Sequence, residues 1–215
     1  MSPVPVEVVM RMLLLGVVVV LVSGCSDDGA GTSAAPSTSG TATTTATATE
    51  SRATGFDQEL HDELVAMLER DQSGRTGGPD AEGDAARTER LKEILAEHGW
   101  PTYDLVGQDG EDAAWAIAQH SDQDPAFRRE ALELLRTAVA AGQASPGNLA
   151  YLEDRVAVAA GQPQTYGTQV GCGPQGPEPA TPLADPAAVD GLRTAAGLEP
   201  LADYLAEMAE ICAAD

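Results

Sequence analysis

The sequence is poor in basic residues. Twelve Lys and Arg stand against 34 Asp and Glu, which gives a formal net charge of −22. Nucleic-acid binding needs lysine and arginine gathered on one face of a protein, so this composition excludes a nucleic-acid partner. Anionic lipid head groups would repel the same acidic surface. The acidity therefore indicates a well hydrated domain, and any contact with a membrane has to be made by another part of the chain.

Several short motifs that mark known chemistry are also missing. The chain has no G-x-S-x-G nucleophile turn and no glycine-rich phosphate loop before a helical segment. No cysteine or histidine has the spacing of a zinc site. His120, Asp122 and Asp124 alternate in HSDQD, but Asp124 is better explained as a helix N-cap. We therefore expect no metal ion and no cofactor.

Long apolar runs are rare, and the clearest one lies near the amino end, at residues 12–22. A membrane-spanning helix needs about 20 apolar residues, so this run is too short and fits the apolar part of an export signal. Ser23, Gly24 and Cys25 follow at once, and LVSGC resembles a bacterial lipobox. The resemblance implies that residues 1–24 are a lipoprotein signal peptide and that Cys25 is lipidated.

The start of this signal has its own pattern. Arg11 follows Met10 and gives a compact basic start, whereas Glu7 would weaken a signal that begins at Met1. We therefore expect translation to begin at Met10. An uncleaved membrane anchor is the less favoured alternative because the apolar run is short. Two or more acyl chains, such as palmitate, anchor a protein stably, and this predicts a lipid-anchored protein on the extracytoplasmic face of the cell membrane.

Residues 25–55 contain almost nothing that can be buried. They are rich in Ser, Thr, Ala and Gly, and such a segment cannot offset the entropy lost on ordering. The composition predicts a disordered tether with a root-mean-square reach of about 30 Å. That reach is enough to hold a small domain away from a membrane surface. The Ser and Thr residues also permit O-glycosylation.

Cysteine is scarce, and this makes its pairing simple to predict. Once Cys25 is assigned to lipidation, Cys172 and Cys212 remain in residues 56–215, a length normal for one domain. An exported chain meets an oxidising compartment, and an even remainder suggests a bridge. We therefore predict a disulfide between Cys172 and Cys212. The competing interpretation makes Cys172 a free nucleophile.

Apolar spacing and helix caps predict an all-α domain. No stretch alternates with period two for long enough to require a sheet. Asp124-Pro125, Ser145-Pro146 and Asp185-Pro186 each place an N-cap before a proline at the first helical position. The pattern predicts six or seven helices, at 57–70, 85–98, from Asp109 or Gly110 to His120, 125–141, 146–160, 186–196 and 199–213.

A long connection, residues 162–183, separates two of these helices. Unstructured connections of this length are unusual inside a compact domain and are often functional. The predicted disulfide at Cys172 would fasten the middle of this connection to the last helix. We therefore expect a surface loop that is held in place.

Several motifs carry a resemblance to a known family. They are HGWP at 98–101, VG at 106–107, AWAIAQHSD at 114–122, LAYLEDRV at 149–156, QTYGTQ at 164–169 and LRTAAGL at 192–198. Together they resemble a family of bacterial domains of unknown function, found in cytosolic proteins and behind export signals. The resemblance covers most of residues 57–205, and QH, EDR and QxYGTQ are its most specific parts. It implies a single helical domain and assigns no activity.

Three groups of polar residues are candidates to line one pocket. They are Gln119 and His120, then Asp154 and Arg155, and then Gln164, Tyr166, Thr168 and Gln169. Tyr151 lies four residues before Arg155 and shares a helix face with it, so the guanidinium could stack on the ring.

These residues allow three interpretations. In a hydrolase or transferase, His120 would be a general base oriented by Asp154, while Arg155 and Tyr166 would hold a polar or anionic substrate. In a structural interpretation, a carboxylate pairs with Arg155 and the glutamines satisfy backbone groups of the loop. The third is a binding surface without catalysis. We favour the structural interpretation for these residues. For the protein as a whole we favour a binding or accessory module with a protein or small-molecule ligand, and keep the enzyme as the alternative.

Overall fold

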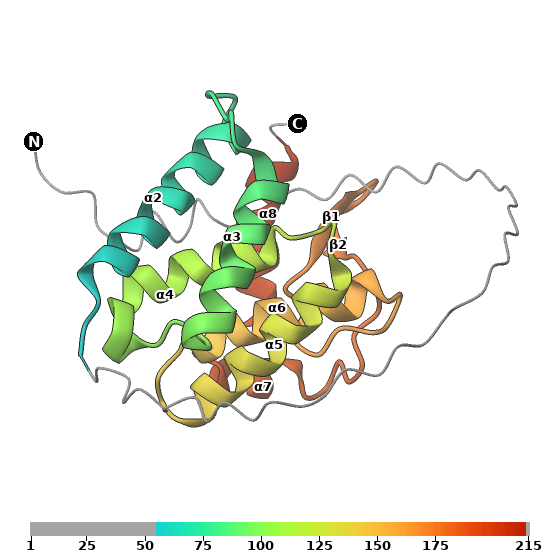
Figure 1. The fold of residues 1–215 in the computed structure, drawn as a ribbon. Helices are drawn as coiled ribbons and strands as arrows, with labels where there is room; N and C mark the ends of the chain where they lie inside the picture. The colour runs from blue at the N-terminus through green and yellow to red at the C-terminus, as the bar shows by residue number, and fades with distance from the viewer. Residues whose placement is uncertain (1–54, 214–215) are drawn as a thin grey trace, which may run out of the picture. The chain divides into compact units, whose positions relative to one another are not determined.

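The computed structural model describes residues 55–213. The predicted signal peptide, the predicted lipidation site Cys25 and nearly all of the predicted tether lie outside the described residues. The described part contains seven helices and one two-stranded hairpin, which confirms the predicted fold class (Figure 1). The elements are α2 (Gln58–Arg75), α3 (Gly83–His98), α4 (Tyr103–Gln119), α5 (Pro125–Ala140), α6 (Pro146–Ala159), β1 (Val170–Gly173), β2 (Gly176–Pro179), α7 (Val189–Ala195) and α8 (Leu201–Cys212).

Helix starts and ends follow the local chemistry that the sequence indicated. Asp124 and Ser145 each accept the backbone N–H of the residue three positions later, which is the geometry of an N-cap. Gly142 and Gly161 follow α5 and α6 with φ angles of 70° and 66°. This left-handed conformation costs glycine little and ends the helices.

Two predicted helix starts are wrong. Helix α4 begins at Tyr103 instead of Asp109 or Gly110, and Gly107 interrupts it with φ 75° and ψ 177°. The first turn before this kink has too few residues to show an apolar period. Helix α7 begins at Val189 instead of residue 186, because the Asp185 carboxylate accepts N–H groups of a separate turn that precedes the helix.

The hairpin was not predicted. Strands β1 and β2 pair antiparallel, with Val170 opposite Pro179 and Gly173 opposite Gly176. Their glycines and prolines show no alternation of apolar and polar residues, which is the usual strand signal. The two strands are held in position by contacts with α8 and by the disulfide, and not by further strands of a larger sheet.

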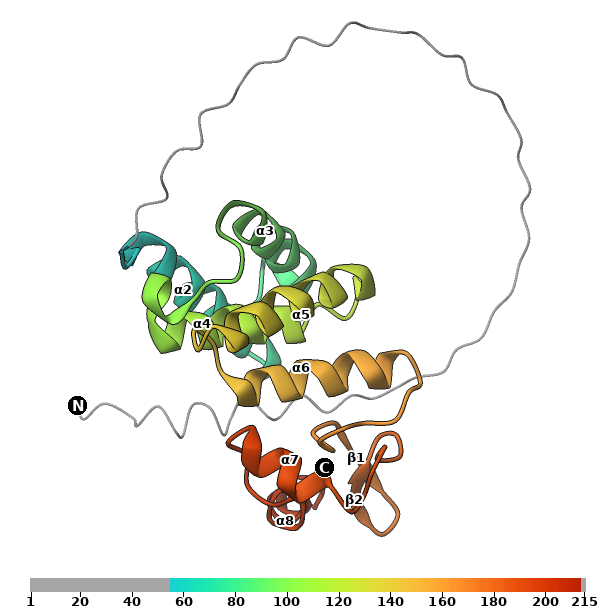
Figure 2. The same ribbon diagram turned by 90° about the horizontal axis from the view of Figure 1, so that it is seen from below.

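The helices divide into two groups around α6. Figure 2 shows α2, α3, α4 and α5 on one side of α6, and α7, α8 and the hairpin on the other. Helix α4 packs against α2, α3, α5 and α6, and four of its alanines are buried, so neighbouring helices approach it closely. The largest buried apolar side chains of the other helices include Leu64, Leu91, Ile94, Leu135 and Leu152. No helix within residues 55–213 is long and apolar enough to cross a bilayer.

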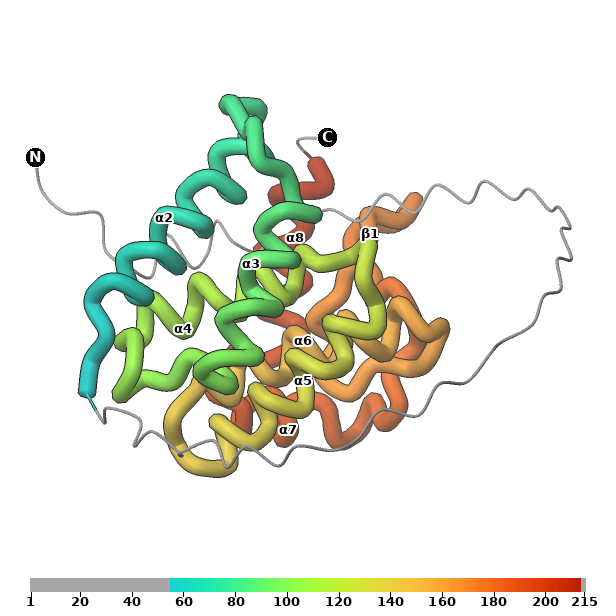
Figure 3. Tube along the Cα trace, viewed as in Figure 1, coloured from blue at the N-terminus to red at the C-terminus, as the bar shows by residue number. Residues whose placement is uncertain are grey.

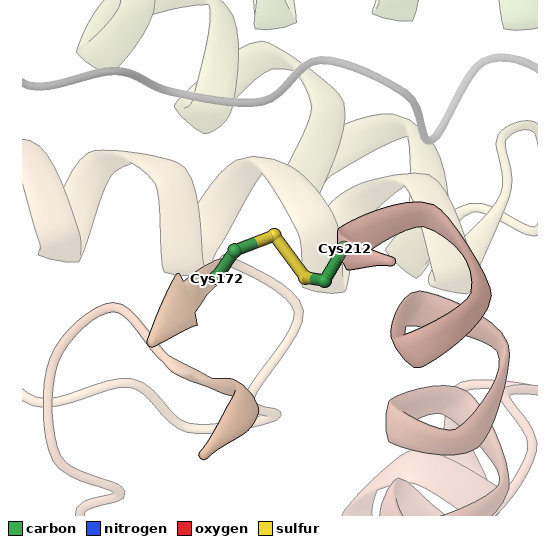
Figure 4. The surroundings of a disulfide bond; sticks show 2 residues. All are labelled: Cys172 and Cys212. Carbon is green, nitrogen blue, oxygen red and sulfur yellow. A yellow bond between two sulfur atoms is a disulfide. The ribbon is translucent and has the colours of Figure 1, made fainter. Parts of the chain in front are cut away.

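The disulfide between Cys172 and Cys212 is confirmed. It joins β1 to the last residue of α8 across a sequence separation of 40 (Figure 4). The connection from α6 to α7 therefore folds back on the carboxyl-terminal helix, as the chain trace in Figure 3 also shows. The Cys172 side of this bridge is exposed to solvent.

Candidate functional site

Helices α4 and α6 run in the same direction, and their contacts advance along both. In order, these contacts are Glu111 with Asn148, Trp115 with Tyr151, and Asp122, just past α4, with Arg155. Gln119 lies one turn after Trp115, as Arg155 lies one turn after Tyr151, so both residues lie toward the same end of this helix pair. Around this end lies what we call the polar cluster: Asp71, Arg75, Gln119, His120, Asp122, Arg128, Arg155 and Gln169.

His120 is held by residues of α2. Its Nδ1 lies 2.9 Å from Oδ2 of Asp71 and 3.1 Å from Nε of Arg75. Arg75 Nε also lies 3.0 Å from the same Asp71 oxygen. Two N–H groups cannot donate to each other, so the consistent arrangement has both the Nδ1–H and the Arg75 Nε–H donating to Asp71. This leaves Nε2 as the basic nitrogen of the imidazole ring.

The charges of this group follow from burial and pairing. Burial lowers the pKa of His120, and the positive charges of Arg75 and Arg155 lower it further against the opposing effect of Asp71. For Asp71, burial acts to raise the pKa, but hydrogen bonds from His120 and Arg75 outweigh it and hold the pKa at about 2. At neutral pH the cluster thus contains a neutral imidazole beside an ionised carboxylate.

A second part of the polar cluster holds one carboxylate between two guanidinium groups. Arg155 Nη2 donates to Oδ2 of Asp122 at 2.7 Å, and Arg128 Nη1 donates to the other oxygen. Arg155 Nη1 also donates to Gln169 Oε1 at 3.1 Å, which ties the long loop to α6. Two positive charges meet one negative charge here, so this part carries a net positive charge inside an acidic protein.

Three buried polar atoms in this region have no hydrogen-bond partner among residues 55–213. They are Trp115 Nε1, Gln119 Oε1 and Arg128 Nε. Two other unpaired nitrogens each lie near a carboxylate: Arg87 Nε is 3.7 Å from Oδ1 of Asp71, and Arg193 Nη2 is 3.5 Å from Oε1 of Glu199. An unsatisfied buried donor or acceptor costs about 1–3 kcal/mol, so its presence in a native protein calls for an explanation.

Asp154 does not orient His120, as the enzyme hypothesis required. Its carboxylate accepts the backbone N–H groups of Thr165, Tyr166 and Thr168, at 2.7, 3.2 and 2.9 Å, and the Thr168 hydroxyl at 3.0 Å. Asp154 therefore organises the start of the long loop, and Asp71 is the carboxylate beside His120.

Gln164 also serves the loop. Its Oε1 accepts the N–H of Gln169 at 2.8 Å, and its Nε2 donates to the carbonyls of Gln169 and Thr181 at 2.9 and 3.2 Å. The Tyr204 hydroxyl donates to the Thr168 carbonyl at 2.9 Å. In this stretch Asp154 and Gln164 therefore satisfy backbone groups of an irregular segment, which is the role that the structural interpretation gave to the glutamines.

Neither predicted aromatic partner lies beside Arg155. The Tyr166 hydroxyl is hydrogen-bonded to Glu153, and burial, followed by the charge of Glu153, raises the pKa of Tyr166. Glu153 and Arg155 are two residues apart, about 200° around the helix, so Tyr166 lies away from the polar cluster. Tyr151 makes edge contacts with Trp115 and Tyr204 instead of stacking on Arg155.

Four members of the polar cluster were not predicted to belong to the pocket: Asp71, Arg75, Arg128 and Asp122, the last of which was considered only in the HSDQD motif. Asp71 and Arg75 lie in the last turns of α2, which extends past its predicted end at residue 70 into a glycine-containing stretch. Their spacing of four, typical of a helical ion pair, was the available signal. Arg128 follows the N-cap of α5 and had no distinguishing pattern of its own.

A buried carboxyl group outside the polar cluster also went unnoticed. Glu111 accepts hydrogen bonds from Trp100 Nε1 and Asn148 Nδ2, both at 3.0 Å. Burial raises its pKa to about 8, against the effect of these two donors. No group of three His, Cys, Asp or Glu side chains within the described residues could hold a metal ion.

Comparison with known proteins gives one match. Residues 58–213 match DUF6624, described as a family of unknown function. No curated protein and no solved structure matches the chain. The matched range runs from the first turn of α2 to the end of α8, so the whole polar cluster lies inside the family's domain.

Proposed function

Because the chain belongs to DUF6624, a family of unknown function, its role has to be inferred from its own residues, and we propose that it is an extracytoplasmic lipoprotein whose domain binds a small polar ligand at the polar cluster. The anchor rests on the lipobox LVSGC and the short apolar run before it. The binding role rests on the cluster itself, which gathers side chains from α2, the end of α4, α5, α6 and the long loop.

The observation that carries the binding role is a pair of buried atoms of the polar cluster without hydrogen-bond partners among the described residues, Gln119 Oε1 and Arg128 Nε. The loop network around Asp154 differs, because there the side chains meet backbone groups and leave none of their own oxygens unpaired. A cluster built only for stability would satisfy its buried acceptors. Unpaired donors and acceptors beside charged groups are what a ligand site presents before its ligand binds.

Thermal unfolding of the purified lipoprotein tests the binding role. A set of small polar compounds is screened on the wild type, Arg155→Ala and the control Arg129→Ala, which removes an exposed arginine on the same helix as Arg128. We expect at least one compound to raise the Tm of the wild type and the control while leaving Arg155→Ala unchanged. If every stabilising compound acts equally on Arg155→Ala, the polar cluster is not the binding site.

Metabolic labelling with a palmitate analogue tests the anchor. We expect the wild type to be labelled and to sediment with membranes, and Cys25→Ser to lose both the label and the sedimentation. An unlabelled wild-type protein would contradict the lipoprotein assignment without affecting the binding role.

The hydrogen bond from His120 to Asp71 favours a second candidate function. A neutral imidazole oriented by a buried carboxylate is the usual form of a general base, and a hydrolase or transferase would use Nε2 to activate water or a hydroxyl group. The test measures hydrolysis of p-nitrophenyl esters and phosphates by the wild type and His120→Ala. A general base contributes about 10²–10⁴-fold to the rate. Equal rates in both proteins would remove this candidate.

A further inference from the structure

The Arg128 and Arg155 side chains form a clamp for a carboxylate. They come from α5 and α6, and both are buried, with side-chain exposures of 3% and 11%. The carboxylate between them belongs to Asp122, whose side chain is 56% exposed and lies in the short connection between α4 and α5. Two fixed cations therefore hold an anion that comes from the surface.

The charge of this clamp is not balanced by its own residues. Asp122 supplies one negative charge to two guanidinium groups, while the nearby Arg75 is already paired with Asp71 and Asp84. His120 adds no negative charge. A second negative charge, brought by a ligand, would restore balance, and guanidinium pairs bind carboxylates and phosphates better than other anions because their N–H groups match two oxygens.

Two unpaired atoms, one on the clamp itself and one elsewhere in the polar cluster, specify the rest of the ligand. Arg128 Nε is a donor without an acceptor, and Gln119 Oε1 is an acceptor without a donor. Oxygens of an oxyanion would accept from Arg128. A hydroxyl group on the same molecule would donate to Gln119.

We propose that Arg128 and Arg155 form an oxyanion site that Asp122 occupies in the unliganded domain, and that the ligand is a small oxyanion carrying a hydroxyl donor. Binding exchanges the Asp122 carboxylate for the ligand, and Asp122 turns outward into solvent. Hydroxycarboxylates and monobasic phosphate share this chemistry. The inference rests on the proposed binding role and adds the class of ligand to it.

Isothermal titration of the lipoprotein with glycolate, phosphate, acetate and glycerol tests the proposal. Glycolate and phosphate carry both an oxyanion and a hydroxyl group, acetate lacks the hydroxyl, and glycerol lacks the charge. We expect glycolate or phosphate to bind more tightly than acetate, and glycerol not to bind. The better of the two identifies the source of the oxyanion.

Variants of the site give the decisive comparison. Asp122→Ala removes the competing carboxylate and should tighten oxyanion binding about tenfold. Arg155→Ala should abolish it, and Gln119→Leu should remove the preference for glycolate over acetate. Arg129→Ala removes a neighbouring exposed charge and should weaken binding far less than Arg155→Ala. Equal affinity of Asp122→Ala and the wild type for the oxyanion would contradict the proposal that Asp122 occupies the site in the unliganded domain.

The outcomes also separate this inference from the function on which it rests. A neutral compound that stabilises the protein in an Arg155-dependent way, with no oxyanion bound, would overturn the oxyanion site and keep the binding role. Absence of any Arg155-dependent ligand would overturn both.

Discussion

At the scale of single residues, Glu111 shows how an acidic protein can contain a carboxyl group that stays protonated. Its side chain is fully buried. Burial, together with the negative charge of Asp112, raises its pKa to about 8. Asp112, its neighbour, has a raised pKa for the same first reason, burial. Both groups accept from the same amide, Asn148 Nδ2.

This burial predicts how stability depends on pH. In the unfolded chain Glu111 ionises near 4.5, whereas in the folded protein it keeps its proton until about 8. Between these values the folded state binds more protons, so stability falls as pH rises, by up to about 1.4 kcal/mol per pH unit from this group. We expect Glu111→Gln to flatten this part of the profile. Urea unfolding at pH 5, 6, 7 and 8 measures it.

The pH-dependent contributions of His120 and Asp112 to stability have to be separated from that of Glu111. The lowered pKa of His120 gives the opposite sign, because the unfolded state then binds more protons below pH 6.5 and stability falls as pH decreases. The double variant Glu111→Gln with His120→Ala isolates the remaining contribution of Asp112. A profile unchanged in Glu111→Gln would show that this group is ionised in the folded protein.

At the scale of elements, the long loop depends on one carboxylate. Asp154 receives three backbone N–H groups and one hydroxyl group of residues 165–168. Asp154→Ala leaves these buried donors without an acceptor, and we expect a loss of about 3–5 kcal/mol in the free energy of unfolding. Glu210→Ala, which removes an exposed carboxylate of α8, is the matched control. Denaturant titration of both variants gives the comparison, and equal midpoints would contradict this role.

The disulfide makes a second contribution at this scale. On the chain-entropy model, closing a loop of 40 residues stabilises the fold by about 4 kcal/mol. We expect the Cys172→Ser, Cys212→Ser protein to unfold at lower temperature and to exchange the amide protons of α8 faster. The helices α2 and α3, which lie on the other side of α6 from α8 and the hairpin (Figure 2), should keep their protection. Uniform loss of protection in hydrogen exchange would show that the two groups of helices unfold together.

Local elements were predictable where the sequence contained local chemistry. The N-caps Asp124 and Ser145 and the glycines that end α5 and α6 are short-range signals, and they located these helices correctly. The kink at Gly107 and the hairpin were missed because tertiary contacts, not apolar periodicity, hold them. The disulfide followed from counting cysteines in a chain that the sequence predicts to be exported.

At the scale of the whole molecule, the site could be predicted only in part. Gln119, His120, Arg155 and Gln169 do meet, but Asp154 and Tyr166, equally prominent in the sequence, belong to other networks. The partner of His120 lies 49 residues earlier in the chain, and no local pattern connects the two. The parallel course of α4 and α6 decides which polar residues face each other, and this follows from packing alone.

The bridge between Cys172 and Cys212 has one more consequence. It turns the hairpin, α7 and α8 into a closed covalent ring of backbone and sulfur. A protease that cuts inside this ring opens it without releasing a fragment, so both pieces migrate together until a reducing agent is added. For a protein expected to work outside the cell, a first cut by a protease within this ring would leave both pieces covalently joined.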